Sequence, residues 1–265
     1  MHFPPYHAIE SHSDPLLSRL MRVLNHEVVG GRLSDEVVRE TLGLISSQDT
    51  PSYGRHAAAF AYLYFVANAV RSKYAVITAI PSLCAAKDRP FHLVDAGAGS
   101  GASTVGTLAA LREVGLRSDA DIVISVIDRS DAQLRLFRLI ALPWVREAFP
   151  NACVQFYQDG ILPGLRRFVN DADLVVGSYI LDELVSSSER AQVRQAFQSA
   201  LRTPDSNYTL IYQRAQDRDT VLESKSFCAF ADPGHRIQVD VSSLGETCNL
   251  SYPPKSSISI WHPIG

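Results

Sequence analysis

The stretch FHLVDAGAGSGAST, residues 91–104, decides the fold of this chain. Its first four residues form a short apolar run that is typical of a buried strand, and Asp95 comes next at the strand end. A turn containing Gly97, Gly99 and Gly101 succeeds it, and the pattern then becomes helical. A strand, a glycine turn and a helix in this order bring backbone N–H groups of an open α/β sheet close to a nucleotide-like ligand. Because a glycine pattern alone is a weak signal, the prediction depends on the residues downstream of the turn.

Strand and helix patterns alternate after this stretch. We expect strands over 91–94, 122–127, 152–157, 172–179, 208–212, 236–241 and 257–261. We expect helices over 103–114, 130–149, 165–169, 186–201 and 220–230. Such alternation predicts an α/β fold with a doubly wound, mainly parallel, seven-stranded Rossmann-like sheet, in which the last strand can be antiparallel.

The residues before the first strand carry only helical patterns. We predict helices over 14–30, 34–45 and 53–80, the last of them continuous or broken near Ser72-Lys73. The chain therefore divides into a helical N-terminal region over 1–90 and a ligand-binding domain over 91–265. We expect the helical region to pack on the domain and to act as a lid on the substrate side.

Composition narrows the class of protein. The formal net charge of −3 argues against a broad nucleic-acid-binding face, and no CxxC or Cys/His cluster predicts a metal site. The longest uncharged apolar stretch, 57–70, is shorter than the ~20 residues that a membrane span needs. The N-terminus lacks the order of basic, apolar and small residues of a secretory signal. We therefore expect a cytoplasmic protein with no membrane partner; the oligomeric state stays open.

Aspartates mark the ends of the first three predicted strands. Asp95, Asp128 and Asp159 each lie at or just after a strand end, and the carboxyl ends of parallel strands line one crevice. Asp128 can accept hydrogen bonds from ribose hydroxyls, and Asp159 from an adenine amino group, with Gly160 leaving room for the ring. The alternative interpretation is that these aspartates only cap helices or turns.

Two adenosine ligands compete for this crevice. The residues Gly97-x-Gly99-x-x-Ala102 also satisfy a dinucleotide fingerprint. That ligand needs a second mononucleotide half, and its acidic residue would come about 20 residues after the fingerprint, nearer than Asp128. Asp95, two residues before Gly97, instead suits a ligand that carries an amino-acid ammonium. This favours S-adenosylmethionine.

The whole set of motifs resembles the class I S-adenosylmethionine-dependent methyltransferases. VDAGAGSG matches their first motif, and Asp128 after IVISVI, YQDG at 157–160 and ADLVVGSYILDEL at 172–184 match the next three in order. More narrowly, ADLVVGSYILDEL and the helix YGRHAAAFAYLYFV resemble the mitochondrial small-ribosomal-subunit methyltransferase-like family and its bacterial relatives. The sequence departs from that family after the fifth strand, where LIYQRAQD replaces a Glu-Pro-Gly-type turn and the downstream cysteine motif is missing.

The resemblance implies S-adenosylmethionine as the cofactor and a set of residues that contact it. The turn holds the methionine part, Asp95 orients it, Asp128 holds the ribose and Asp159 meets the adenine. The implied contact residues are Asp95, Gly97, Ala98, Gly99, Gly101, Thr104, Asp128, Arg129, Asp159, Gly160, Ser178 and Tyr179. Arg55, just inside the long apolar helix, reaches the cofactor carboxylate or an acidic substrate, or stays solvated.

The segment after the fourth strand is expected to face the acceptor. Tyr179 would shape the methyl pocket, and Asp182 or Glu183 would take a proton from a hydroxyl or amine, unless these two only begin the next helix. We therefore expect a methyltransferase acting on oxygen or nitrogen of a small molecule or peptide. The alternatives are a ribosome-associated factor that binds the cofactor with little or no catalysis, and an enzyme that uses the cofactor for another reaction, such as a cyclisation.

Overall fold

The computed structural model describes residues 33–46, 53–79, 89–178, 180, 187–202, 207–213, 236–239 and 256–261. The helices expected over 14–30 and 220–230 lie outside these residues. None of the described helices is both long enough and apolar enough to cross a bilayer.

Strands and helices alternate along the described chain as expected. The strands are β1 (Phe91–Ala96), β2 (Ile122–Asp128), β3 (Cys153–Gln158), β4 (Leu174–Ser178), β5 (Asn207–Gln213), β6 (Arg236–Val239) and β7 (Ser256–Trp261). The helices are α2 (Asp35–Ser46), α3 (Tyr53–Ala79), α4 (Ala102–Glu113), α5 (Asp131–Ala148), α6 (Ile161–Leu165) and α7 (Ser187–Ala200).

The sheet has the strand order β3-β2-β1-β4-β5-β7-β6. β1 pairs in parallel with β2 and β4, β2 pairs in parallel with β3, and β4 with β5. β7 runs antiparallel to both β5 and β6. The predicted α/β class with a parallel sheet is therefore confirmed. Because β1 lies between two parallel neighbours, every one of its residues is buried, as expected for a central strand.

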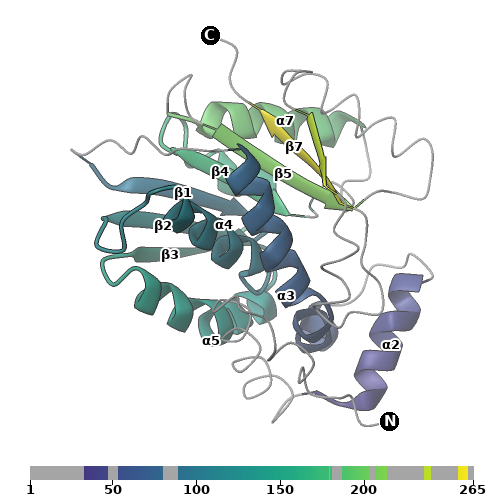
Figure 1. Cartoon of the computed structure of the whole chain (residues 1–265). Coiled ribbons are helices and arrows are strands. Elements are labelled where there is room, and N and C mark those ends of the chain that lie inside the picture. The colour runs from purple at the N-terminus through teal and green to yellow at the C-terminus, as the bar shows by residue number, and fades with distance from the viewer. Residues whose placement is uncertain are drawn as a thin grey trace.

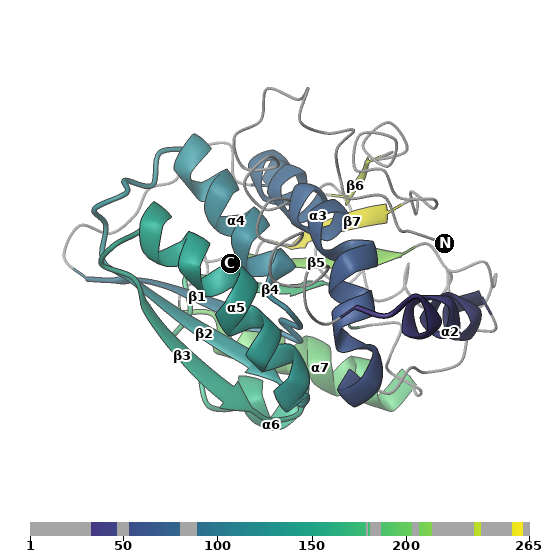
Figure 2. The ribbon, with the colours of Figure 1, turned by 90° about the horizontal axis from the view of Figure 1, so that it is seen from below.

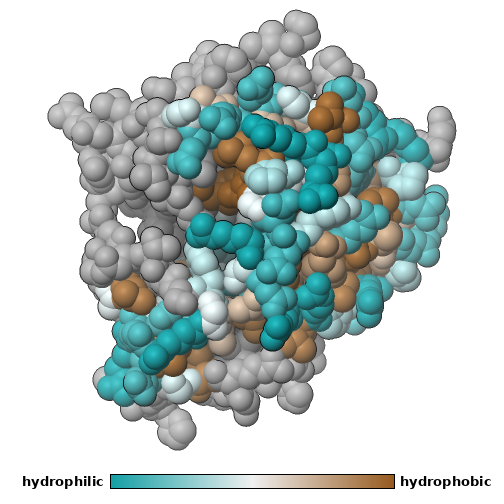
Figure 3. Space-filling view, turned by 180° about the vertical axis from the view of Figure 1, so that it is seen from behind, coloured by the Kyte–Doolittle hydropathy of each residue, from teal (hydrophilic) through white to brown (hydrophobic). Residues whose placement is uncertain are grey.

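Helices cover both faces of the sheet. α3, α4 and α5 lie on one face, and α6 and α7 on the other (Figure 1, Figure 2). Strand residues alternate between the two faces, so β1 sends Leu93 into a core with α3, α4 and α5, and Val94 into a second core with α6 and α7. The face turned away from the viewer of Figure 1 shows hydrophobic patches enclosed by hydrophilic side chains (Figure 3).

Helix α3 is continuous through Ser72-Lys73, where the sequence left a break open. Ser72 is buried at the contact with α4, and Lys73 forms an ion pair with Glu113 at the end of α4. The polar pair therefore marks a helix–helix contact and not a break. Apolar residues of α3, among them Phe65 and Ala69, share the core of α4 and α5, so α3 packs on the sheet domain as expected.

The short helix after β3 lies earlier than predicted. The sequence placed it over 165–169, whereas α6 spans Ile161–Leu165. Gly160 caps its start, and the chain reverses soon afterwards at Asn170, whose φ of 53° is left-handed. The expectation was wrong because Leu165 ends the helix instead of starting it, and Phe168 packs in the second core from the segment after the helix.

Candidate functional site

The glycine turn is tied to the end of β2. The backbone N–H groups of Gly97 and Ala98 both donate to the carbonyl oxygen of Ile127, at 2.9 and 3.0 Å. Gly101 N–H closes the turn by donating to the carbonyl oxygen of Ala98. These bonds fix the position of the loop between β1 and α4 relative to Asp128.

The three glycines of the turn have different roles, although all have positive φ. A Cβ on Gly97 would overlap Ile180, and one on Gly101 would lie 2.7 Å from the Phe137 ring of α5, so these two permit close packing. A Cβ on Gly99 would meet only the side-chain oxygen of Gln133, at 3.9 Å. Of the three, only Gly99 therefore borders open space.

Asp128 lies next to this open position. Its Oδ2 accepts a hydrogen bond from Gly99 N–H at 2.8 Å, and its Oδ1 accepts one from Ser130 N–H at 2.8 Å. The carboxylate is thus held by backbone groups on both sides, half-buried at the end of β2. A carboxylate oxygen can accept more than one hydrogen bond.

Asp95 is fully buried near the end of β1. Its Oδ2 accepts hydrogen bonds from the hydroxyls of Ser103 and Thr104 at 2.6 and 2.5 Å, which ties β1 to the first turn of α4. Burial raises the pKa of Asp95 to about 6, against these hydrogen bonds, which lower it. Thr104, predicted as a cofactor contact, is itself fully buried and serves this carboxylate.

Three buried polar atoms near the strand ends have no hydrogen-bond partner in the described part of the chain. They are Asp95 Oδ1, Gln133 Oε1 and Ser178 Oγ. Buried polar atoms are nearly always satisfied in folded proteins, and these lie on or beside the elements that carry the glycine turn. The gap suits a ligand that offers several N–H or O–H donors, which is the chemistry of an amino acid joined to a nucleoside.

Gln133 was not predicted as a site residue. It occupies the glutamine position of the Ser-x-x-Gln capping-box pattern at the start of α5, and its backbone N–H does donate to Ser130 Oγ at 3.3 Å. Its side chain, however, does not return to the cap; it is buried against Gly99 instead. The sequence of a capping box does not show whether its glutamine side chain bonds the helix start or turns elsewhere, so this residue could not be identified from the sequence.

Asp159 lies beside Asp128 but already has a charged partner. Its backbone N–H donates to the carbonyl oxygen of Asp128 at 3.1 Å, and its Oδ2 accepts from Arg167 at 2.8 Å. The hydrogen bond from Arg167 lowers the pKa of Asp159. A Cβ on Gly160 would make only ordinary contact with Pro163, at 3.5 Å, so this position does not require glycine for space within the protein itself.

The remaining predicted residues fall into two groups. Arg55 is exposed and pairs with Glu40 of α2 at 2.8 Å, while the guanidinium of Arg129 lies 5.8 Å from the Tyr53 ring centre. Ser178 ends β4, beside the turn. The three proposed catalytic residues, Tyr179, Asp182 and Glu183, lie outside the described residues. Within the described part of the chain, no group of three or more metal-ligating side chains occurs.

No protein-family profile matches the chain, and no curated protein sequence matches it. Solved structures do match. The CurJ carbon methyltransferase aligns with a TM-score of 0.53 and 12% identity over 95% of this chain and 68% of that one. A geranyl diphosphate methyltransferase, solved in complex with GPP and sinefungin, aligns with a TM-score of 0.49 and 14% identity over 95% of this chain and all (100%) of that one. The methyltransferase domain of the citrinin polyketide synthase aligns with a TM-score of 0.46 and 15% identity over 94% of this chain and 66% of that one. The chain therefore shares the fold of the CurJ methyltransferase.

Proposed function

We propose that this chain is an S-adenosylmethionine-dependent methyltransferase acting on an oxygen or nitrogen of a small molecule or peptide. One observation carries the proposal. The open space at Gly99 is bordered by Asp128 and by the unpartnered Oε1 of Gln133, and two more unpartnered oxygens of the described chain, those of Asp95 and Ser178, lie toward the ends of the neighbouring strands. These acceptors match the ammonium, hydroxyl and amino donors of S-adenosylmethionine.

Each residue then has a stated role. Asp95 Oδ1 accepts from the ammonium group, Asp128 holds the ribose hydroxyls, and Asp159 meets the adenine amino group. Ala98, Thr104, Arg129 and Ser178 complete the surroundings, and Gln133 Oε1 supplies one further acceptor. Arg55 now pairs with Glu40, and we assign it to the carboxylate of the cofactor only if that ion pair opens.

The bound cofactor would supply a methyl group on a positively charged sulfur. The protein's own contribution is to position the acceptor in line with it, and alignment of reactants can lower a barrier by ~7–11 kcal/mol. We assign Asp182 or Glu183 to remove the acceptor's proton and Tyr179 to line the methyl pocket. We further propose that the strand order above is the complete seven-stranded sheet of residues 91–265, and that residues 1–90 form the acceptor side.

Small-molecule methyl acceptors occur among the named structures, since a geranyl diphosphate methyltransferase is one of them. The fold shared with the CurJ methyltransferase does not test the narrower family resemblance, which stays a sequence-based prediction. The alternative of a ribosome-associated binding factor has no supporting observation among the described residues, and we do not carry it further.

Asp128 provides the test of this proposal. We expect Asp128→Ala to weaken S-adenosylmethionine binding at least tenfold in calorimetry, because a hydrogen bond to a charged group is worth ~1.5–3 kcal/mol. Asp131→Ala is the matched control, since Asp131 lies three residues on and pairs with Arg135 on the surface. Thermal unfolding checks that both variants fold.

Two results would count against the proposal. Unchanged affinity in a folded Asp128→Ala variant would remove the ribose assignment. A wild-type protein that binds neither S-adenosylmethionine nor its demethylated product would contradict the function itself. Transfer of a tritiated methyl group into small-molecule fractions of a cell extract, with no transfer into ribosomal particles, is the expected activity.

A further inference from the structure

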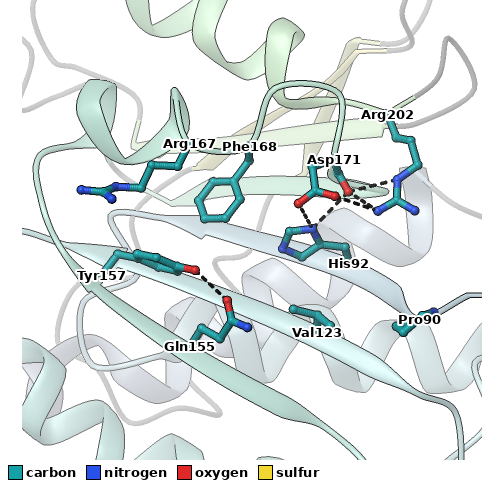
Figure 4. A pocket seen from close by; sticks show the side chains of 9 residues that line it. All are labelled: Pro90, His92, Val123, Gln155, Tyr157, Arg167, Phe168, Asp171 and Arg202. Atoms are coloured by element: carbon teal, nitrogen blue, oxygen red, sulfur yellow. Dashed lines mark hydrogen bonds and ion pairs between the residues drawn. The ribbon is translucent and has the colours of Figure 1, made fainter.

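A hollow of about 390 Å³ lies on the sheet face that carries α6 and α7, away from the glycine turn. It exists because α6 is only 5 residues long and packs over the far end of β2, where Gly164 meets Ile127. No helix of the described chain covers the starts of β1, β2 and β3 on this face. The residues that line the hollow are Pro90, His92, Val123, Gln155, Tyr157, Arg167, Phe168, Asp171 and Arg202 (Figure 4).

The hollow is separate from the proposed cofactor site. His92 and Val123 are the second residues of β1 and β2, whereas the cofactor site lies at the opposite, carboxyl ends of these strands. Their side chains also point to the face opposite the one on which α4 and α5 pack. A ligand in the hollow therefore does not occupy the space beside Gly99.

One wall of the hollow is fixed in place by hydrogen bonds. His92 is buried; its Nδ1 lies 3.0 Å from the carbonyl oxygen of Asp171, and its Nε2 lies 2.9 Å from Ser125 Oγ. Since a carbonyl only accepts, Nδ1 donates to it, and the Ser125 hydroxyl, which can donate or accept, pairs with Nε2. Arg202 donates to the carbonyl oxygen and carboxylate of the same Asp171 (Figure 4). This wall is pre-organised, which lowers the cost of binding.

The other wall is aromatic. The rings of Tyr157 and Phe168 meet edge to face with centres 5.3 Å apart, and Phe168 also contacts the His92 ring at 5.5 Å. The guanidinium of Arg167 lies 5.7 Å from the centre of the Tyr157 ring. Tyr157 donates its hydroxyl proton to Gln155 Oε1 at 2.6 Å, which leaves the amide N–H₂ of Gln155 as a donor at the floor.

The arginines of the lining keep donors for an anion. Arg202 pairs with Asp171 of the lining, and Arg167 pairs with Asp159 outside it, so each guanidinium is balanced by one carboxylate. A guanidinium has five N–H donors, and the bonds described above use one nitrogen of Arg167 and two of Arg202, so donors are left for a ligand. We propose that this hollow is a binding site for a small aromatic monocarboxylate, whose ring packs on Phe168 and Tyr157 and whose carboxylate pairs with Arg167.

Benzoate serves as the probe, with the full-length protein and ligand-observed NMR titration. We expect saturable binding in the millimolar range, and at least tenfold weaker binding of benzamide, which has the same shape without the charge. Arg167→Gln should weaken the binding of benzoate at least fivefold. Arg166→Gln is the matched control because Arg166 is the exposed neighbour that does not line the hollow, and it should leave binding unchanged.

A second variant fills the space instead of removing charge. Gln155→Trp, on the exposed face of β3, should abolish benzoate binding while the protein stays folded. Benzoate should also bind while S-adenosylhomocysteine is present, and this arm separates the hollow from the proposed cofactor site. The proposal is overturned by the absence of saturable binding, by equal binding of benzamide, by binding that survives both Arg167→Gln and Gln155→Trp, or by mutually exclusive binding of the two ligands.

Discussion

Gly106 of α4 lies so close to Ala69 of α3 that a Cβ on Gly106 would overlap the carbonyl oxygen of Ala69. The same Cβ would come within 2.8 Å of the Ser72 side chain. Both helices belong to the larger core, in which Phe65 is almost fully buried. The contact between α3 and the sheet domain therefore depends on the missing side chain of one glycine.

Gly106→Ala is expected to destabilise the protein, because the atom in the way is backbone and cannot turn aside as a flexible side chain does. Overpacking of this kind costs ~1–3 kcal/mol. Urea unfolding measures it. Gly43→Ala in α2 is the control, since nothing lies within 4 Å of a Cβ there, and replacing an interior helix glycine should stabilise by roughly 0.5–1 kcal/mol. Equal stability of Gly106→Ala and wild type would show that the two helices are less tightly packed than described.

Asp95 gives the stability of the protein a pH dependence. Burial raises its pKa from the ordinary 3.8 to about 6, so the folded protein binds this proton more tightly than the unfolded chain does. The free energy of unfolding should therefore fall as pH rises from about 4 to about 6, and this contribution should be constant above that window. Asp95→Asn removes the titrating group. The free energy of unfolding of the wild type minus that of the variant should therefore fall as pH rises across the window. Parallel curves in urea unfolding at several pH values would contradict the shift.

Asp173 holds together the start of β1 and the start of β4. Its carboxylate accepts two bonds from Arg89, at 2.6 and 2.7 Å, and a third from His92 N–H at 2.9 Å. Asp173→Ala should cost about 1.5–3 kcal/mol, since it removes the acceptor of several charge-assisted bonds at a largely buried position. Asp119→Ala, in the exposed pair with Arg117, is the control and should leave the thermal midpoint unchanged. A similar midpoint for both variants would mean that the bidentate pair adds nothing.

The elements with strong local patterns could be predicted from the sequence. The strand, glycine turn and helix at 91–113 and the long α3 have clear apolar patterns, and Ser130 marks the start of α5. The contact of Gly106 with Ala69 could not be predicted, because it depends on how two helices cross and not on the pattern within either one. The displaced α6 shows the same limit, since Phe168 is buried in the second core although it lies outside the helix.

At the candidate site, the sequence identified the aspartates but not their present partners. The bond from Arg167 to Asp159 joins residues eight positions apart, on either side of the short helix α6, and Arg55 pairs with a carboxylate of another helix. Gln133 holds a capping-box position in the sequence, while its side chain borders Gly99. Pairings of this kind depend on which side chains the folded chain brings together, and residue types at fixed spacing do not encode them.

Arg167 links the two proposed sites: it lines the hollow under α6, and it pairs with Asp159 beside the strand ends. An acid that draws the guanidinium into the hollow leaves Asp159 with a less compensated charge and a stronger preference for a donor. Thermodynamic reciprocity then requires that whatever binds at Asp159 changes the affinity for the acid by the same factor. If both proposed sites exist, this shared arginine makes binding in the hollow and binding at the end of β3 depend on each other, through a single side chain.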